Sequence, residues 1–271
     1  MHNISVDSVH IMGILNVTPD SFYKNNSIDY INKNPNFLKY SDIIDVGCES
    51  SRPFSSSIDL NTELKRLSTF IESNNMDEQY LSIDTYKPEV AKFALQNGFS
   101  MINDIKSGGD DNAMFHIAAE YDCPLILMHM KGDPSNMQIK PYYENVIDEI
   151  ISFFEIKLEI AHKCGLRNEN IILDPGIGFG KRIEDNDSII LNLSKIKQFE
   201  LPLLVGLSRK SFLSIDNDEP EFRLPSTLAA TVLAIQNGAN ILRVHDVLET
   251  YKIIKTIKRI NKNEIRELNE V

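Results

Sequence analysis

Short apolar segments recur eight times along this chain of 271 residues, with longer mixed segments between them. The eight are rich in Ile, Val and Leu and nearly continuous, which is typical of parallel strands covered on both faces. They comprise residues 10–17, 42–50, 80–85, 100–105, 124–130, 170–176, 201–208 and 239–247.

Helical patterns separate several of these predicted strands. Residues 88–98 open with a Pro and close with a Gly, and residues 142–165 form a long amphipathic pattern that a Gly also ends. Residues 226–239 and 247–260 continue the alternation. Eight strands alternating with helices predict an α/β fold, a (β/α)8 TIM barrel, with a doubly wound open sheet as the alternative.

The weakest parts of the pattern lie toward the two ends of the chain. Residues 23–42 are rich in Asn and contain Pro35, which predicts a short or irregular first helix. Residues 261–271 are polar, and we expect a frayed, solvated helix end there. Because no low-complexity linker interrupts the alternation, residues 1–271 are predicted to form a single domain.

Every predicted strand ends in polar residues. In chain order these are Asn16, residues 49–52, Asp84, Asn103, His129, Asp174, residues 208–210, and Arg243 with His245. A structural role is the alternative for each one taken singly, since Asp84 could cap the next helix and Asp174 could be a turn residue. Because ligands of parallel α/β folds bind at the carboxyl ends of the strands, we expect the eight ends to build one shared site.

The glycine-rich segment "DPGIGFGK" (174–181) resembles a phosphate loop but fits neither common template. Gly176 and Gly180 enclose three residues where a Walker motif has four, and Lys181 occupies the third Gly position of the dinucleotide spacing. The segment therefore predicts only a turn that brings backbone close to a ligand.

The charge and composition exclude several classes of partner. A net charge of −11 argues against sequence-independent binding to nucleic acid or to an anionic membrane. No apolar run is long enough for a membrane helix, and the N-terminus lacks the pattern of a secretory signal, so we predict a cytoplasmic protein. Cys48, Cys123 and Cys164 lack a CxxC spacing and are expected to be reduced thiols.

An acidic protein that binds an anion needs a local cluster of cationic side chains. Arg243 and His245 alternate along one predicted strand and so lie on the same side of it, and Lys210 follows the preceding strand. Together they predict a phosphate or pyrophosphate site.

Asp84, Asn103 and Asp174 form a second group of strand ends with a different chemistry. Carboxylates and an amide in an otherwise apolar mouth suit a flat heterocycle with several N–H donors. The residues therefore predict a barrel that binds a nitrogen heterocycle on one side and pyrophosphate on the other.

Eight motifs, taken together and in order, resemble the dihydropteroate synthase family over about residues 12 to 247. They are "GILNVTPDSF", "ESSRP", "IDTYKPEV", "INDI", "LMHMKGDPSNMQ", "LDPGIGFGK", "VGLSRKS" and "RVHDV". The resemblance implies condensation of 6-hydroxymethyl-7,8-dihydropterin pyrophosphate with 4-aminobenzoate to 7,8-dihydropteroate and pyrophosphate. The C–O bond is expected to break early, giving a pterin methylene cation, with Mg2+ and fixed cations acting on the leaving group.

The same resemblance assigns roles to individual residues. It implies that Asn16 holds the metal and the pyrophosphate, with Arg243 and His245 as further pyrophosphate ligands. The implied pterin set is Asp84, Asn103, Met128, Asp174, Phe179, Gly206, Lys210 and Arg243. The implied aminobenzoate set is Ser51, Arg52, Pro53 and Ser211. Among all of these, the expected catalytic residues are Asn16, Asp84, Lys210, Arg243 and His245.

Two loops depart from the family pattern. Residues 23–26 read "YKNN" where the family has Ser-Asp-Gly-Gly, while Ser51 replaces a Thr and Phe54 a Gly. Phe54 restricts the backbone where a flexible residue is expected, so turnover and sulfonamide sensitivity depend on these loops.

Three other functions remain open at this point. A pterin-binding paralogue without synthase activity fits the altered loops. A pterin-dependent methyltransferase has no use for the cationic cluster, and a purely structural barrel leaves the polar strand ends without a purpose. The resemblance also implies a homodimer, since family members are usually homodimers.

Overall fold

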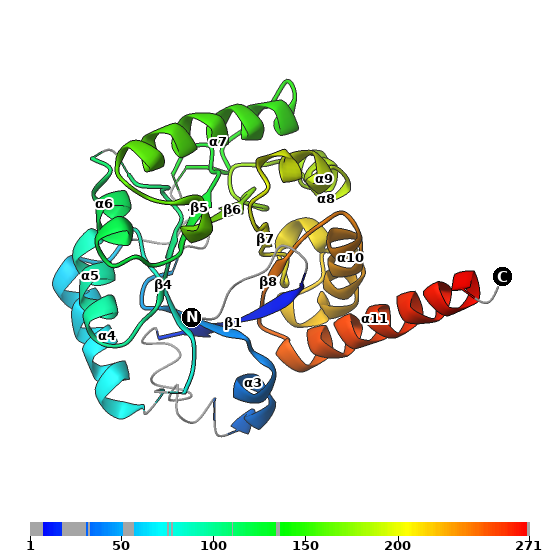
Figure 1. Cartoon of the computed structure of the whole chain (residues 1–271), viewed down its shortest axis with the longest axis horizontal. Coiled ribbons are helices and arrows are strands. Elements are labelled where there is room, and N and C mark those ends of the chain that lie inside the picture. The colour runs from blue at the N-terminus through cyan, green and yellow to red at the C-terminus, as the bar shows by residue number, and fades with distance from the viewer. Residues whose placement is uncertain are drawn as a thin grey trace.

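The computed structural model describes residues 8–17, 31, 33–50, 57–74, 76, 78–109, 111–133 and 136–269, with side chains up to residue 262. Eight parallel strands, one from each predicted segment, surround a common axis with the helices outside them (Figure 1). The strands are β1 (His10–Asn16), β2 (Ile43–Gly47), β3 (Leu81–Asp84), β4 (Met101–Asp104), β5 (Leu125–Met128), β6 (Ile171–Asp174), β7 (Leu204–Val205) and β8 (Ile241–Val244).

The order of the strands closes the sheet into a barrel. Neighbours run β6-β5-β4-β3-β2-β1-β8-β7, so the last strand of the chain pairs with the first. A parallel bridge between Leu173 and Leu203 then joins the two edges. A doubly wound sheet keeps its edges apart, so the predicted TIM barrel is confirmed and the open-sheet alternative is wrong.

Helices follow the strands as the alternation predicts. In the described part of the chain they are α3 (Pro35–Tyr40), α4 (Leu60–Ser73), α5 (Pro88–Gln96), α6 (Ala113–Glu120), α7 (Val146–Lys163), α8 (Ile183–Leu191), α9 (Leu193–Ile196), α10 (Leu224–Gln236) and α11 (Val247–Asn269). Short 3-10 helices occupy Asn168–Asn170, Lys197–Phe199, Ser211–Leu213 and Pro220–Phe222. As expected from Pro35, α3 is short.

Local capping sets the helix boundaries. Helix α7 starts later than the amphipathic pattern because the side chain of Asn145 accepts a hydrogen bond from the N–H of Ile147 at 3.1 Å. Helix α5 begins at Pro88 and ends before Gly98, whose φ is +92°.

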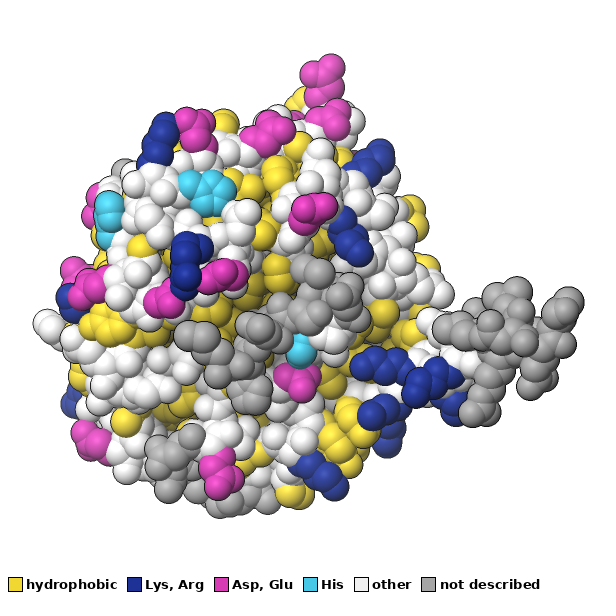
Figure 2. Space-filling model, in the orientation of Figure 1, with side chains coloured by type: hydrophobic (Ala, Val, Ile, Leu, Met, Phe, Trp, Pro, Cys, Tyr) yellow, Lys and Arg dark blue, Asp and Glu magenta, His cyan; other side chains and the backbone are white. Residues whose placement is uncertain are grey.

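Helix α11 is longer than its apolar pattern, reaching Asn269 and projecting away from the barrel (Figure 1). Lys and Arg side chains gather along the part of it next to the barrel (Figure 2). Fraying of residues 261–271 stays a prediction. Across the described residues, no helix is both long and apolar enough to cross a membrane.

Two layers of side chains fill the inside of the barrel. The layer nearer the strand starts is apolar and consists of Met12, Ile43, Met101, Ile126, Ile172, Leu204 and Ile241. Side chains two positions apart in a strand face the same side, so the residues two positions later form the next inward layer. These are Ile14, Asp45, Asn103, Met128, Asp174, Gly206 and Arg243. An apolar layer therefore lies beneath a layer with four polar side chains, Asp45, Asn103, Asp174 and Arg243, which we call the polar layer.

Candidate active site

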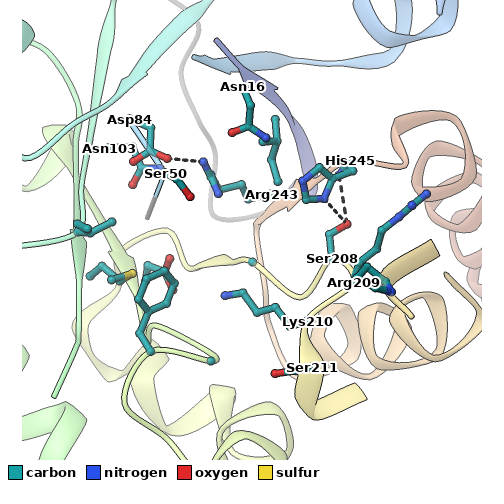
Figure 3. A pocket seen from close by; sticks show the side chains of 18 of the residues that line it. Asn16, Ser50, Asp84, Asn103, Ser208, Arg209, Lys210, Ser211, Arg243 and His245 are labelled. Atoms are coloured by element: carbon teal, nitrogen blue, oxygen red, sulfur yellow. Dashed lines mark hydrogen bonds and ion pairs between the residues drawn. The ribbon is translucent and has the colours of Figure 1, made fainter. Parts of the chain in front are cut away.

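A cavity of about 720 Å³ opens above the polar layer, a size typical of small-molecule sites (Figure 3). Most of the residues predicted from sequence line it: Asn16, Asp84, Asn103, Met128, Asp174, Phe179, Gly206, Lys210, Ser211, Arg243 and His245. Ile14, Ile105 and Met137 add apolar wall that sequence reasoning did not single out. The predicted residues Ser51, Arg52 and Pro53 lie outside the described residues, as do residues 23–26 and Phe54.

His129 does not line the cavity, so the expectation that this polar residue joins the shared site is wrong, although Met128 at the end of β5 does line it. The ring of His129 is buried and packs edge-on against Phe153 of α7, with ring centroids 5.0 Å apart. Burial, helped by Lys181, lowers the pKa of His129 to about 2 and keeps the ring neutral. Alternation explains the difference, because Met128 points inward and its neighbour must point outward.

Arg243 lies between two carboxylates. Its Nε donates to Asp45 Oδ2 at 2.6 Å, and its Nη2 donates to Asp84 Oδ2 at 2.6 Å. Figure 3 shows the guanidinium pointing toward Asp84 and Asn103 rather than toward His245. Asp45 and Asp84 outweigh burial and hold the pKa of Arg243 above its usual value. The expected cationic cluster is therefore partly neutralised from within the protein.

Asp45 lies in the middle of β2, so the pattern of polar strand ends does not predict it. It lies inside the apolar run "DIIDVG", two positions after Ile43, and is fully buried. A carboxylate at an inward position of a buried strand is costly unless it has a partner. A carboxylate within such an apolar run therefore indicates that a cationic side chain lies beside it in the fold.

The carboxylates that face the cavity are strongly desolvated. Burial raises the pKa of Asp84 to about 7, although Arg243 opposes the shift. Burial also raises the pKa of Asp174, with Lys210 opposing. Hydrogen bonds to such groups are stronger than in water because the surroundings are poorly polarisable.

Lys210 extends into the cavity rather than into solvent (Figure 3). Its Nζ donates to the carbonyl of Ile177 and lies 4.7 Å from the centre of the Phe179 ring. Burial lowers the pKa of Lys210 to about 8, with Asp174 opposing. Lys210 is therefore a cation inside the candidate site and not a solvated surface side chain.

His245 and Asn16 line the cavity beside Arg243 (Figure 3). The backbone N–H of His245 donates to Ser208 Oγ at 3.2 Å, and ring Nδ1 lies 3.0 Å from the same oxygen. This double contact fixes the ring orientation. Next to it, Arg209 and Asp246 form a bidentate ion pair at 2.9 and 2.6 Å that joins the loop after β7 to the loop after β8.

The side-chain amide of Asn16 brings to the cavity an oxygen of the kind that Mg2+ binds. Mg2+ takes oxygen ligands and usually keeps waters and substrate phosphates with one or two protein oxygens. Asn16 offers one amide oxygen. Within the described residues no group of three or more His, Cys, Asp or Glu could form a cage for a metal.

The glycine-rich loop after β6 brings backbone close to backbone. A Cβ on Gly176 would lie 1.9 Å from the carbonyl oxygen of His129, and one on Gly180 would lie 2.2 Å from that of Lys131. Buried Lys181 secures the contact, since its Nζ donates to the carbonyls of His129, Gly176 and Phe179 at 2.9 to 3.1 Å. The predicted approach to a ligand therefore applies only to Gly178, which lines the cavity.

This packing predicts a large stability cost for Gly176→Ala. Gly109→Ala is the matched control, because φ is +68° at Gly176 and +65° at Gly109, where a Cβ would meet nothing within 4 Å. Both variants bear the cost of a left-handed backbone, about 1 kcal/mol. Overpacking should cost Gly176→Ala about 2 to 3 kcal/mol more, measured by urea unfolding. Equal losses in the two variants would contradict the packing argument.

Comparison with known proteins identifies the family. A family model described as pterin binding enzyme matches residues 12–245. Dihydropteroate synthase of Escherichia coli (strain K12) is 39% identical over 264 residues, covering 94% of this chain and 93% of that protein. Dihydropteroate synthase of Clostridium beijerinckii is 40% identical over 257 residues, covering 92% and 93%.

Solved structures agree with the sequence matches. The Yersinia pestis dihydropteroate synthase in a sulfonamide drug complex gives a TM-score of 0.88 at 37% identity, covering 95% of this chain and 96% of that one. The Xanthomonas albilineans dihydropteroate synthase with 4-aminobenzoic acid gives 0.84 at 32% identity, covering 94% of each chain. With matches spanning nearly its whole length, the chain belongs to the dihydropteroate synthase family of pterin binding enzymes.

Proposed function

We propose that this chain condenses 6-hydroxymethyl-7,8-dihydropterin pyrophosphate with 4-aminobenzoate, giving 7,8-dihydropteroate and pyrophosphate. One observation carries the proposal. A single cavity brings hydrogen-bond acceptors for a heterocycle together with cations for a diphosphate. The reaction makes the chain a transferase, of the class that moves alkyl or aryl groups other than methyl.

The pterin binds among the acceptors on the β3, β4 and β6 side. Asp84 and Asp174 accept the N–H donors of the pterin ring, and the amide of Asn103 lies beside Asp84 (Figure 3). Their burial makes an unpaired N–H or carboxylate costly, which favours this heterocycle over rings with fewer donors. Met128, Phe179 and Gly206 supply the walls of this part of the cavity.

The pyrophosphate binds among Asn16, Arg243 and His245. Lys210, whose Nζ lies over the ring of Phe179, binds the pterin and adds positive charge to the same cavity. Negative charge grows on the leaving group as its C–O bond to the pterin methylene breaks, so fixed cations there stabilise the transition state more than the ground state. When bound at Asn16, Mg2+ supplies further positive charge to the pyrophosphate oxygens. The arylamine nitrogen then attacks the electron-poor methylene carbon and loses a proton.

The 4-aminobenzoate binds on the outer side of the cavity. Ser211 lines that side and lies at the start of a 3-10 helix that follows Lys210. Ser51, Arg52 and Pro53 complete the aminobenzoate site in this proposal. The chain forms a single domain and acts in the cytoplasm. It assembles as a homodimer, and sedimentation of the purified protein tests this oligomeric state.

The decisive experiment measures pyrophosphate release from dihydropterin pyrophosphate and Mg2+, with and without 4-aminobenzoate. The proposal expects release that rises with aminobenzoate and equals the dihydropteroate formed. Tight binding of the pterin substrate without dihydropteroate would instead identify a binding paralogue. Methyl transfer from a methylated pterin would identify a methyltransferase.

The raised pKa of Asp84 predicts that pterin affinity falls as the pH drops below about 7. Protonation removes the acceptor that the pterin N–H donors need, so affinity should fall up to about tenfold per pH unit. Folding responds oppositely. The pKa of Asp84 in the folded protein lies above its usual value of 3.8. Its contribution to the free energy of unfolding is therefore greatest below pH 3.8 and is lost as the pH rises through about 7.

Calorimetric titration with a pterin that lacks pyrophosphate measures this dependence without the titration of the phosphate itself. Asp84→Asn is the matched variant, because its amide does not titrate, and its weaker affinity should show no step near pH 7. An equally pH-dependent affinity in Asp84→Asn would assign the step to another group, and a flat wild-type curve would contradict the prediction.

A further inference from the structure

Asp45 is the most deeply buried charged group below the cavity and has no assigned role. It belongs to the inward layer on β2, with no exposed surface. Its Oδ2 accepts hydrogen bonds from Arg243 Nε at 2.6 Å and from Asn103 Nδ2 at 3.0 Å. Its Oδ1 has no hydrogen-bond partner among the described residues. One oxygen thus carries both contacts, directly under the proposed pterin site.

The guanidinium of Arg243 is held at two different points. Nε, next to the aliphatic stem, contacts Asp45, whereas Nη2, at the tip, contacts Asp84. Asp84 lines the cavity and is the proposed acceptor for the pterin, so a pterin that binds Asp84 Oδ2 competes with Arg243 for that oxygen. A ligand in the cavity cannot contact Asp45 as it can contact Asp84, because Asp45 has no exposed surface.

We propose that Asp45 is a positioning residue for Arg243. When the pterin takes Asp84, Asp45 keeps hold of Nε, so the stem stays in place and the tip nitrogens are free to turn to the pyrophosphate. Occupation of the heterocycle site thereby completes the diphosphate site. The inference rests on the proposed function, since it assigns the pterin and pyrophosphate to these residues.

The charge balance supports this arrangement. The side chain of Arg243 is only 20% exposed, and a cation with so little hydration needs a carboxylate beside it. Transferring Asp84 to the pterin removes one of its two carboxylate partners. Asp45 remains as the second. Attraction at this depth is weakly screened by water, so one carboxylate suffices to retain the side chain.

The test is a double-mutant cycle on binding, with Asp45→Asn, Arg243→Ala and the double variant. Pyrophosphate with Mg2+ is titrated into protein that is saturated with a pterin lacking pyrophosphate, and pterin affinity is measured separately. Asp45→Asn keeps an oxygen that can accept from Nε but removes the negative charge that retains the guanidinium, so it should weaken pyrophosphate binding roughly tenfold or more and pterin binding less. In the Arg243→Ala background it should cause no further loss. Turnover should fall mainly in kcat rather than in KM for the pterin substrate.

Asp42→Asn is the matched control, because Asp42 precedes the same strand at the opposite end of the barrel and is exposed. Its carboxylate accepts the N–H of Ile11 at 2.8 Å, which an amide oxygen can also do. Both ligand affinities should stay at the wild-type value.

Three results would overturn the proposal: unchanged pyrophosphate affinity in Asp45→Asn, equal losses for pterin and pyrophosphate, or the same loss with and without Arg243. If Asp45→Asn does not fold, the smaller neutral variant Asp45→Ser takes its place. Failure of both to fold would make Asp45 a structural residue and also overturn the proposal. The double-mutant cycle measures binding and needs no turnover. It can therefore be carried out and interpreted even if the wild-type protein forms no dihydropteroate, so failure of this inference is distinguishable from failure of the proposed function.

Discussion

Arg243→Ala should lower turnover by about 100- to 1,000-fold, the usual effect of removing one donor that stabilises charge in a transition state. From the sequence alone, we expect this variant to lose turnover without unfolding. The structure adds an effect on folding, because Arg243 is the ion-pair partner of both Asp45 and Asp84. Removing it leaves two buried carboxylates close together, which should cost about 3 kcal/mol of unfolding free energy. Steady-state pyrophosphate release and urea unfolding measure the two effects separately.

The matched control for this prediction is Arg182→Ala. Arg182 also pairs with a carboxylate, Asp185, at 2.7 Å, but it lies at the start of α8 and does not line the cavity. Its replacement should cost some stability and leave kcat close to the wild-type value. A folded Arg243→Ala variant with near-normal turnover would remove Arg243 from the pyrophosphate site.

Strand positions and their polar ends were predictable because both follow from local pattern. Apolar runs set the strands, and parallel strands in a barrel must place their carboxyl ends together. Asp84, Asn103 and Asp174 were found on that basis and lie in one cavity. Alternation could have taken the prediction further, since Met128 at an inward position requires that His129 face the helices.

The ion pairs of the site were not predictable in the same way. Asp45 and Arg243 are separated by 198 positions along the chain. They meet because β2 and β8 both flank β1 and both turn these side chains inward, a consequence of the barrel closing. The motif around Arg243 predicts that this side chain binds an anionic ligand. In the structure it forms ion pairs with two carboxylates of the protein, Asp45 and Asp84. The register between the strands decides which inward side chains form ion pairs, and no local sequence pattern determines that register.

Asp174→Asn should weaken pterin binding by two to three orders of magnitude, about 3 to 4 kcal/mol, although it only replaces one carboxylate oxygen by an NH2 group. The N–H of Gly176 donates to Asp174 Oδ1 at 2.7 Å, which fixes the side chain. An amide in this place keeps its oxygen on the Gly176 N–H and must turn its NH2 group toward the cavity. A donor then faces the donors of the pterin, and a buried hydrogen bond to a charged group is lost as well.

Asp104→Asn separates this effect from the general cost of altering a buried carboxylate. Asp104 is adjacent to Asn103 on β4 but points outward, where it accepts the N–H groups of Lys106 and Gly108 at 2.8 and 2.7 Å. Its replacement should lower the unfolding free energy by about 1 to 3 kcal/mol and change pterin affinity little. Calorimetric titration and urea unfolding of both variants give the comparison. Because Asp174→Asn keeps the Gly176 contact, its larger loss should appear in binding. The reverse outcome, a stability loss in Asp174→Asn with unchanged pterin affinity, would make Asp174 the turn residue that its place before Pro and Gly alone suggests.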